Sequence, residues 1–129
     1  MNNILLLFTM IFSHIIDDYC LQAVLLSQLK QKAWWKNQEQ YNDKYKYDYI
    51  IALAMHSFSW AFMTMCPILF TMPQQVRASF IIAFIVNVII HAVVDDLKAN
   101  KLKINLVQDQ LIHLAQIIVT WLVIIVFEV

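Results

Sequence analysis

The stretch that decides the fold is FIIAFIVNVIIHAVVDDLK, residues 80–98. It lies in an apolar run from about Val76 to Leu97, close to the length of about 20 residues that a helix needs to cross a bilayer. Glycine is absent from the chain and proline occurs only 2 times, which favours long helices over tight turns. The run is therefore predicted to be a transmembrane helix, because unpaired backbone polar groups are too costly in lipid.

Three further apolar runs have the same character. The run nearest the N-terminus differs from a signal peptide because it has no basic beginning and contains polar residues, so we interpret it as a retained helix. We predict an all-α fold, an integral membrane four-helix bundle in a single transmembrane domain that covers residues 1–129. The predicted helices cover about residues 4–29, 49–72, 76–97 and 106–127.

The composition supports the membrane interpretation and excludes other classes. The 129 residues are 61% hydrophobic and 14% charged, whereas a soluble domain is about 45–50% apolar and about 25% charged. The 9 basic residues balance 9 acidic ones, so there is no basic surface for nucleic acid, and none is expected as a partner. Cys20 and Cys66 are too few for a disulfide framework or a thiolate zinc site.

The connections between the predicted helices indicate an orientation. Residues 30–48 and 98–105 contain all the lysines of the chain, and the longer connection is also rich in Trp and Tyr, which is typical of a membrane interface. The positive-inside rule places both connections in the cytoplasm and therefore both termini on the outer side. We expect a multi-pass protein of the inner cell membrane, with the lipid bilayer as its surroundings.

Polar residues recur inside the apolar runs at spacings of three and four, which places them on one face of each helix. Every histidine of the chain lies in a predicted span. With the third connection cytoplasmic, the polar faces are expected to converge in the cytoplasmic half of the bilayer. The polar residues are His14, Asp18 and Gln22 in the first span, His56 in the second, Asn87, His91 and Asp95 in the third, and Asp109, His113, Gln116 and Thr120 in the fourth.

Such groups need a physical reason to be in lipid. A charged Asp at mid-membrane costs about 2.5–3.5 kcal/mol, whereas an interhelical hydrogen bond contributes only about 0.6 kcal/mol on average. Hydrogen-bonded support of the bundle and a proton or ion pathway are alternatives, but His and Asp are also the usual ligands of zinc, manganese and iron. We therefore predict a centre for one or two such ions near the cytoplasmic face. Its predicted ligands are His14, Asp18, His56, His91, Asp95, Asp109 and His113, with Asp18, Asp95 and Asp109 as the candidate catalytic carboxylates.

Several catalytic patterns are missing from the sequence. There is no HExxH and no ExxH, and the 4 histidines are too few for the histidine-rich boxes of membrane desaturases. Metal-assisted hydrolysis of a membrane-associated small molecule or lipid is the reaction class that remains. The alternative is a homo-oligomeric ion or proton channel, a transporter or a membrane-acting regulatory protein that uses the same cluster.

The polar motifs resemble those of a known family. His14-Ile-Ile-Asp-Asp18-Tyr-Cys-Leu-Gln22 resembles the HxxxDFxLQ motif of domain-of-unknown-function family 3307, with Tyr in place of the usual Phe. His91 to Lys98 is similar to its HxxxDxxK, Asp109 to His113 to its DQxxH, and His56 to its lone second-helix histidine. The resemblance implies a small bacterial or phage membrane protein in which the same seven residues are functional. The motifs also show a looser resemblance to inner-membrane metal-dependent hydrolases.

Overall fold

A computed structural model describes residues 3–71 and 78–128 of the protein. These residues form helices joined by turns and loops, and no strand occurs among them. Four helical stretches are long and apolar enough to cross a membrane, Asn3–Leu21, Asp43–Thr71, Ser79–Ala99 and Leu106–Val126. This confirms the predicted all-α fold with four membrane-capable helices. The predicted ends of the second and third helices, at Met72 and Val76, lie outside the described residues.

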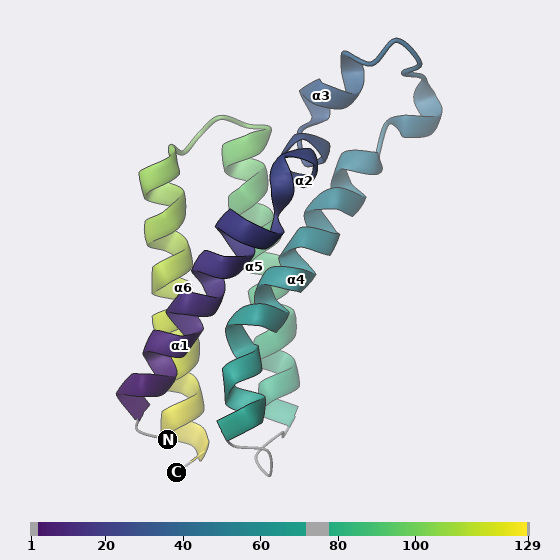
Figure 1. Ribbon diagram of the computed structural model, residues 1–129. Coiled ribbons are helices and arrows are strands. Elements are labelled where there is room, and N and C mark those ends of the chain that lie inside the picture. Colours follow the sequence, from purple (N-terminus) through teal and green to yellow (C-terminus); the bar gives the residue numbers. More distant parts are fainter. Residues whose placement is uncertain (1–2, 72–77, 129) are drawn as a thin grey trace.

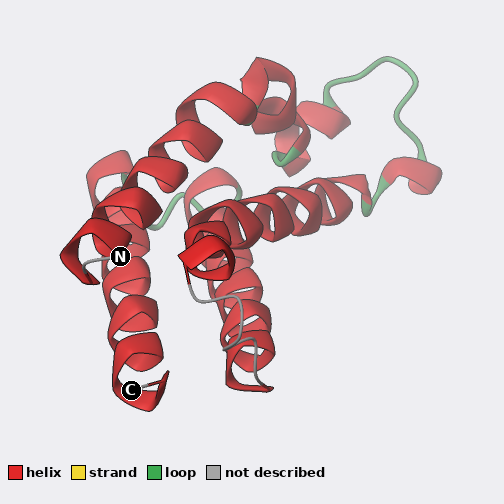
Figure 2. Ribbon diagram, turned by 60° about the horizontal axis from the view of Figure 1, so that its bottom comes forward, coloured by secondary structure: helices red, strands yellow, loops and turns green. Residues whose placement is uncertain are grey.

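The long helices pack as a four-membered bundle (Figure 1). Helix α4 contacts both α1 and α5, and α6 contacts both α5 and α1. The two termini lie at one end of the bundle, and α3 with the loop after it projects at the other end (Figures 1 and 2). The elements in chain order are α1 (Asn3–Ile16), η1 (Asp17–Leu21), α2 (Ala23–Leu29), α3 (Lys32–Lys36), η2 (Asp43–Tyr45), α4 (Asp48–Thr71), α5 (Ala78–Ala99) and α6 (Leu106–Glu128).

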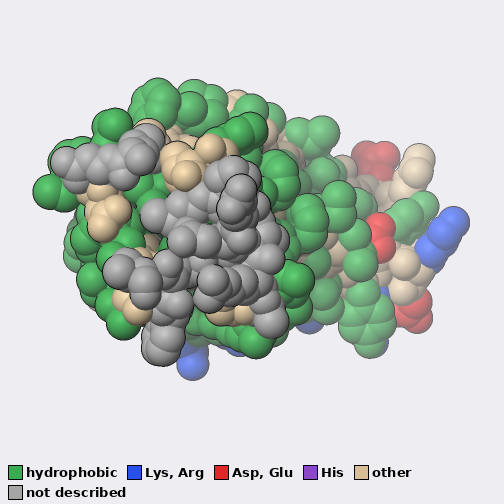
Figure 3. Space-filling view, turned by 90° about the horizontal axis from the view of Figure 1, so that it is seen from below, with side chains coloured by type: hydrophobic (Ala, Val, Ile, Leu, Met, Phe, Trp, Pro, Cys, Tyr) green, Lys and Arg blue, Asp and Glu red, His purple; other side chains and the backbone are tan. Residues whose placement is uncertain are grey.

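The bundle is apolar outside and partly polar inside. Large apolar side chains such as Phe8, Val24 and Ile89 are exposed on its flanks, and a soluble protein seldom exposes so much contiguous apolar surface. Figure 3 shows apolar side chains around the visible flanks, with most of the visible charged side chains on the projecting part. An apolar core around Met10, Trp60 and Ile117 fills the interior. This distribution suits a bundle surrounded by lipid.

The first helix is not continuous, so the prediction of one helix over residues 4–29 was wrong. It widens into a π-helical turn, η1, in which the Gln22 amide donates to the Asp17 carbonyl at 2.8 Å. At Ala23 the backbone then turns to a φ of 50°. A left-handed conformation costs a residue with a Cβ about 1–2 kcal/mol. The wide turn holds the adjacent residues Asp17 and Asp18 inside the bundle, where their carboxylates meet polar partners.

We expect Ala23→Gly to stabilise the protein by about 1 kcal/mol, because glycine adopts a positive φ without the Cβ penalty. The measurement is thermal or denaturant unfolding in detergent. The control is Ala54→Gly at an exposed position inside α4, where the same change should destabilise by about 0.5–1 kcal/mol. A loss of stability in both variants would contradict a strained Ala23.

Candidate metal centre

Four imidazoles meet inside the bundle, one from each of its long helices. His14 comes from α1, His56 from α4, His91 from α5 and His113 from α6, and each is at most 2% exposed. The ring centroids of His91 and His113 are 4.1 Å apart and those of His56 and His91 are 5.0 Å apart. Residues that are distant in the sequence are therefore brought to one place by the packing of the four helices.

Asp95 of α5 lies among three of these rings, those of His56, His91 and His113. Its Oδ1 atom is 3.8 Å from Nε2 of His91 and 3.5 Å from Nε2 of His113. Its Oδ2 atom is 3.5 Å from Nε2 of His56. Contacts of this length exceed a good hydrogen bond. The carboxylate and the three rings thus face one another with room for a further partner.

Two other predicted carboxylates belong to the same cluster. Asp109 of α6 places Oδ1 3.4 Å from Nε2 of His113. Asp18 of η1 places Oδ1 3.7 Å from Nε2 of His56 and Oδ2 3.6 Å from Nδ1 of His14. Gln110 links them, because its amide nitrogen donates to Oδ2 of Asp18 at 3.1 Å and to Oδ2 of Asp109 at 3.2 Å. All seven predicted ligands therefore lie in one connected cluster.

Within this cluster, two groups of three residues have ligand atoms close enough to share a metal ion. One group is Asp18, His56 and His91, the other is His91, Asp95 and His113, and in each the atoms lie within 4.8 Å of one another. Both ring nitrogens of His91 and of His113 are buried without a hydrogen-bond partner in the described part of the chain. Buried polar atoms are almost always satisfied. A cation that accepts the lone pair of one nitrogen on each ring would satisfy one of the two buried atoms of each histidine, so the residues fit a metal ion.

His14 is held differently from the other three histidines. The indole nitrogen of Trp60 donates to its Nδ1 atom at 2.8 Å. Its Nε2 atom lies 3.2 Å from Oε1 of Gln110 and donates to it, since Nδ1 is the acceptor. Both ring nitrogens are thus used by the protein, and His14 lies outside both three-residue groups. Asp109 also lies outside them. The geometry gives these two residues a supporting place beside the candidate ligands.

The sequence did not indicate Lys30 as part of the site. It was expected in a cytoplasmic connection, but it is only 6% exposed. Its Nζ atom is 2.5 Å from Oδ2 of Asp95. Lys98 makes a similar contact at the edge of the cluster, 2.6 Å from Oδ2 of Asp109. No sequence signal marks the burial of Lys30, because its partner Asp95 lies 65 residues away in another helix.

A second addition is the carboxylate of Asp17, which is fully buried. It accepts a hydrogen bond from Oγ of Ser59 at 2.7 Å, and its Oδ2 atom is 3.7 Å from Nδ1 of His56. This contact is longer than a hydrogen bond, so Asp17 lies behind the His56 ring without bonding to it. The spacing of three between His14 and Asp17 was the available signal for it.

Polar residues further along the bundle support the packing. The Asn87 amide donates to Oγ1 of Thr120 at 2.9 Å, and the Gln116 amide donates to Oδ1 of Asn87 at 2.8 Å. We call Asn87, Gln116 and Thr120 the polar belt. It joins α5 to α6 on the same faces that carry His91 and His113. These residues therefore act as hydrogen-bonding groups between helices.

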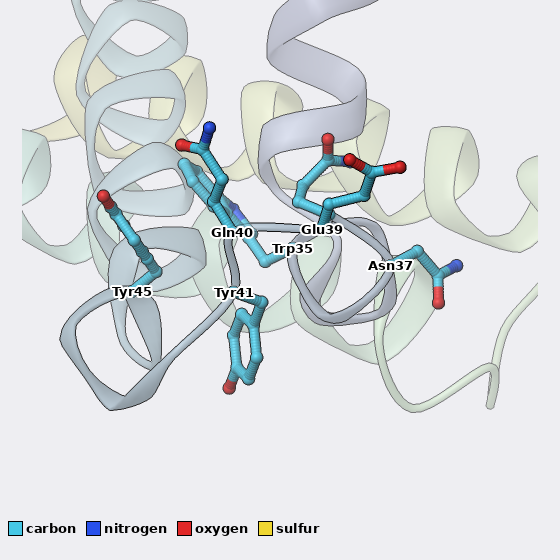
Figure 4. Close-up of a pocket in the computed structure, with 7 residues that line it drawn as sticks. Trp35, Asn37, Glu39, Gln40, Tyr41 and Tyr45 are labelled. Atoms are coloured by element: carbon cyan, nitrogen blue, oxygen red, sulfur yellow. The ribbon is translucent and has the colours of Figure 1, made fainter.

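Cavities elsewhere lack this chemistry. One of about 570 Å³ lies in the projecting part, where it is lined by residues such as Trp35, Glu39 and Tyr45 (Figure 4). Another of about 650 Å³ is an apolar groove between α5 and α6. Cys20 and Cys66 are both free. Among the described residues, only the buried cluster unites His and Asp side chains in groups that fit a metal ion.

Comparisons of the chain with family models, curated proteins and solved structures find no match. The resemblance of its motifs to domain-of-unknown-function family 3307 stays a prediction. The interpretation of the site therefore depends on the geometry of the chain itself.

We expect Trp60→Phe to lower the free energy of unfolding by about 1–3 kcal/mol, because it leaves the buried Nδ1 atom of His14 without its donor. The control is Trp121→Phe, which makes the same ring change at a partly buried position and removes an exposed hydrogen bond to the Asn3 carbonyl; its cost should be smaller, because it leaves no buried polar atom without a partner. Unfolding in detergent followed by circular dichroism measures both. Equal effects of the two substitutions would contradict a structural role for the Trp60–His14 bond.

Proposed function

We propose that the protein is a multi-pass membrane protein that binds a divalent transition metal, zinc, manganese or iron, between its four helices. Asp18, His56, His91, Asp95 and His113 are the proposed ligands. The observation that carries the proposal is the set of buried ring nitrogens on His91 and His113 that no described residue satisfies. Two groups of ligand atoms lie within metal-binding distance around them. The motif resemblance to family 3307 agrees with this proposal.

We further propose that the centre hydrolyses a membrane-associated substrate. A bound metal ion supplies Lewis acidity and a more acidic water. The buried Oδ1 atom of Asp109, which is not among the proposed ligands, has no hydrogen-bond partner among the described residues, so it is available to accept a proton at the edge of the cluster. Lys98, whose side chain is 37% exposed, offers a cation to an anionic head group. The lysine-rich connections favour a site that faces the cytoplasm of the cell.

The polar belt favours a second candidate, an ion or proton pathway through an oligomer. Asn87, Gln116 and Thr120 continue from His91 and His113 along the same helix faces. Chains of polar and ionisable groups across a membrane serve pumps and channels. Proteoliposomes separate the two candidates, since a pathway predicts flux without product formation and a hydrolase predicts product without flux.

Metal content tests the first proposal. Purified wild-type protein should hold a transition metal, and His91→Ala or His113→Ala should weaken binding by more than the about 10–100-fold cost of losing a supporting residue. The control is His14→Gln, which should stay within that smaller range because both ring nitrogens of His14 have protein partners. Elemental analysis and calorimetry in detergent provide the measurements. A wild-type protein without metal, or equal losses in all three variants, would refute the proposed centre.

The proposed orientation has its own test. In a background of Cys20→Ala and Cys66→Ala, a cysteine added at either terminus should react with a membrane-impermeant maleimide in intact spheroplasts. Lys44→Cys, in the connection proposed to be cytoplasmic, should react only after lysis, because the lysine-rich connections stay inside. The reverse labelling pattern would move the centre to the outer half of the bilayer.

A further inference from the structure

Lys30 enters the middle of the candidate centre. Its Nζ atom and Nε2 of His56 both contact Oδ2 of Asp95, at 2.5 and 3.5 Å. His56 also belongs, with Asp18 and His91, to one of the two groups that could share a metal ion. The ammonium of Lys30 contacts Asp95 of one group and, through the shared Oδ2 atom, lies within about 6 Å of Nε2 of His56 in the other, so it is a cation close to the second possible metal position.

The backbone around Lys30 is fixed in place. The side-chain amide of Asn100 donates to the Lys30 backbone carbonyl at 3.0 Å, and the backbone N–H of Lys32 donates to Oδ1 of Asn100 at 2.7 Å. When the side-chain amide of Gln22 is oriented so that both its oxygen and its nitrogen have partners, the oxygen accepts from Nζ of Lys30 and the nitrogen donates to the Asp18 carbonyl. Helix α2, which follows the turn at Ala23 (Figure 1), is thus tied to the end of α5. Lys30 is positioned by several contacts rather than by its own ion pair alone.

The charges of the cluster limit how many ions it can hold. The four carboxylates of the cluster face two ammonium groups, those of Lys30 and Lys98, so neutral imidazoles leave two negative charges uncompensated. One divalent cation balances them. Two divalent cations would leave two positive charges inside an apolar bundle, and uncompensated buried charge is strongly unfavourable. The four carboxylates are those of Asp17, Asp18, Asp95 and Asp109.

We infer that Lys30 fills the second cation position of the proposed centre, so that each chain binds one metal ion, in the group of His91, Asp95 and His113. This inference rests on the proposed metal binding. An ammonium group offsets charge and donates hydrogen bonds, but it has no vacant site for water. Lys30 therefore determines the number of ions that the centre binds and leaves any metal-bound water at the other position.

Lys98 provides a matched comparison, since it is also a lysine paired with a carboxylate of the cluster. Its Nζ atom is 2.6 Å from Oδ2 of Asp109, but its side chain is 37% exposed. Asp109 itself is only 1% exposed, but unlike Asp95 it belongs to neither of the two groups that could share a metal ion. Removal of the Lys98 charge should therefore leave the number of bound ions unchanged.

The experiment is a zinc titration of the purified full-length chain in detergent, with bound zinc measured by calorimetry and by elemental analysis after removal of free metal. Wild-type protein, Lys30→Arg and Lys98→Met should each bind about one ion per chain. Lys30→Met should bind about two, because the position that the ammonium leaves then has more uncompensated negative charge than in the wild type. Adding Asp18→Asn to Lys30→Met removes one ligand and one negative charge. This double variant should return to about one ion.

Each outcome decides a separate question. Two ions in the wild-type protein would overturn the inference, as would one ion bound with unchanged affinity by Lys30→Met. Two ions bound by the double variant would also overturn the inference. This measurement still tests it if Lys30→Met alone does not fold. Absence of zinc from the wild-type protein, in contrast, would refute the proposed metal centre itself. One ion in the wild type and two in Lys30→Met support the inference.

Discussion

A carboxylate buried among apolar helices needs its charge compensated by its neighbours, and Asp95 has polar neighbours from nearly every part of the bundle. Its two oxygens contact His91 of its own helix, His113 of α6, His56 of α4 and Lys30 at the end of α2. Each partner approaches from a different direction. The register of α4, α5 and α6, and the bend between α1 and α2, are therefore coupled through one side chain.

Such coupling matters more in lipid than in water. Lipid tails are as apolar as Leu side chains, so apolar burial gives little preference for one helix arrangement over another. In this bundle the exposed flanks are apolar and the specific contacts are internal. The His/Asp cluster fixes one half of the bundle and the polar belt joins α5 to α6 in the next turns. The same groups that fit a metal ion thus also specify how the helices pack.

The sequence predicts the parts of this arrangement that follow from periodicity. Apolar length identified four helices, and spacings of three and four placed His91 with Asp95 and Asp109 with His113 on interior faces. It did not predict the bend at Ala23, because the chain has no glycine there to mark a positive φ. The burial of Lys30, directly after the helix that follows this bend, was missed as well. Nor does spacing distinguish His14 from the other histidines, since its partners Trp60 and Gln110 come from other helices.

The contact between Lys30 and Asp95 also bears on the choice between a fixed metal centre and a cation pathway. A cation that moves through the cluster must pass Asp95, whose Oδ2 atom is already paired with the Lys30 ammonium. The same ammonium contacts the side-chain oxygen of Gln22, and the Lys30 carbonyl accepts a hydrogen bond from the side-chain amide of Asn100. Displacing that ammonium would leave it buried without its partner, and breaking a buried ion pair in this way costs about 3–5 kcal/mol. A metal ion that stays beside Oδ1 of Asp95 requires no such displacement. The arrangement around Lys30 therefore favours a stationary ion over a conducted one.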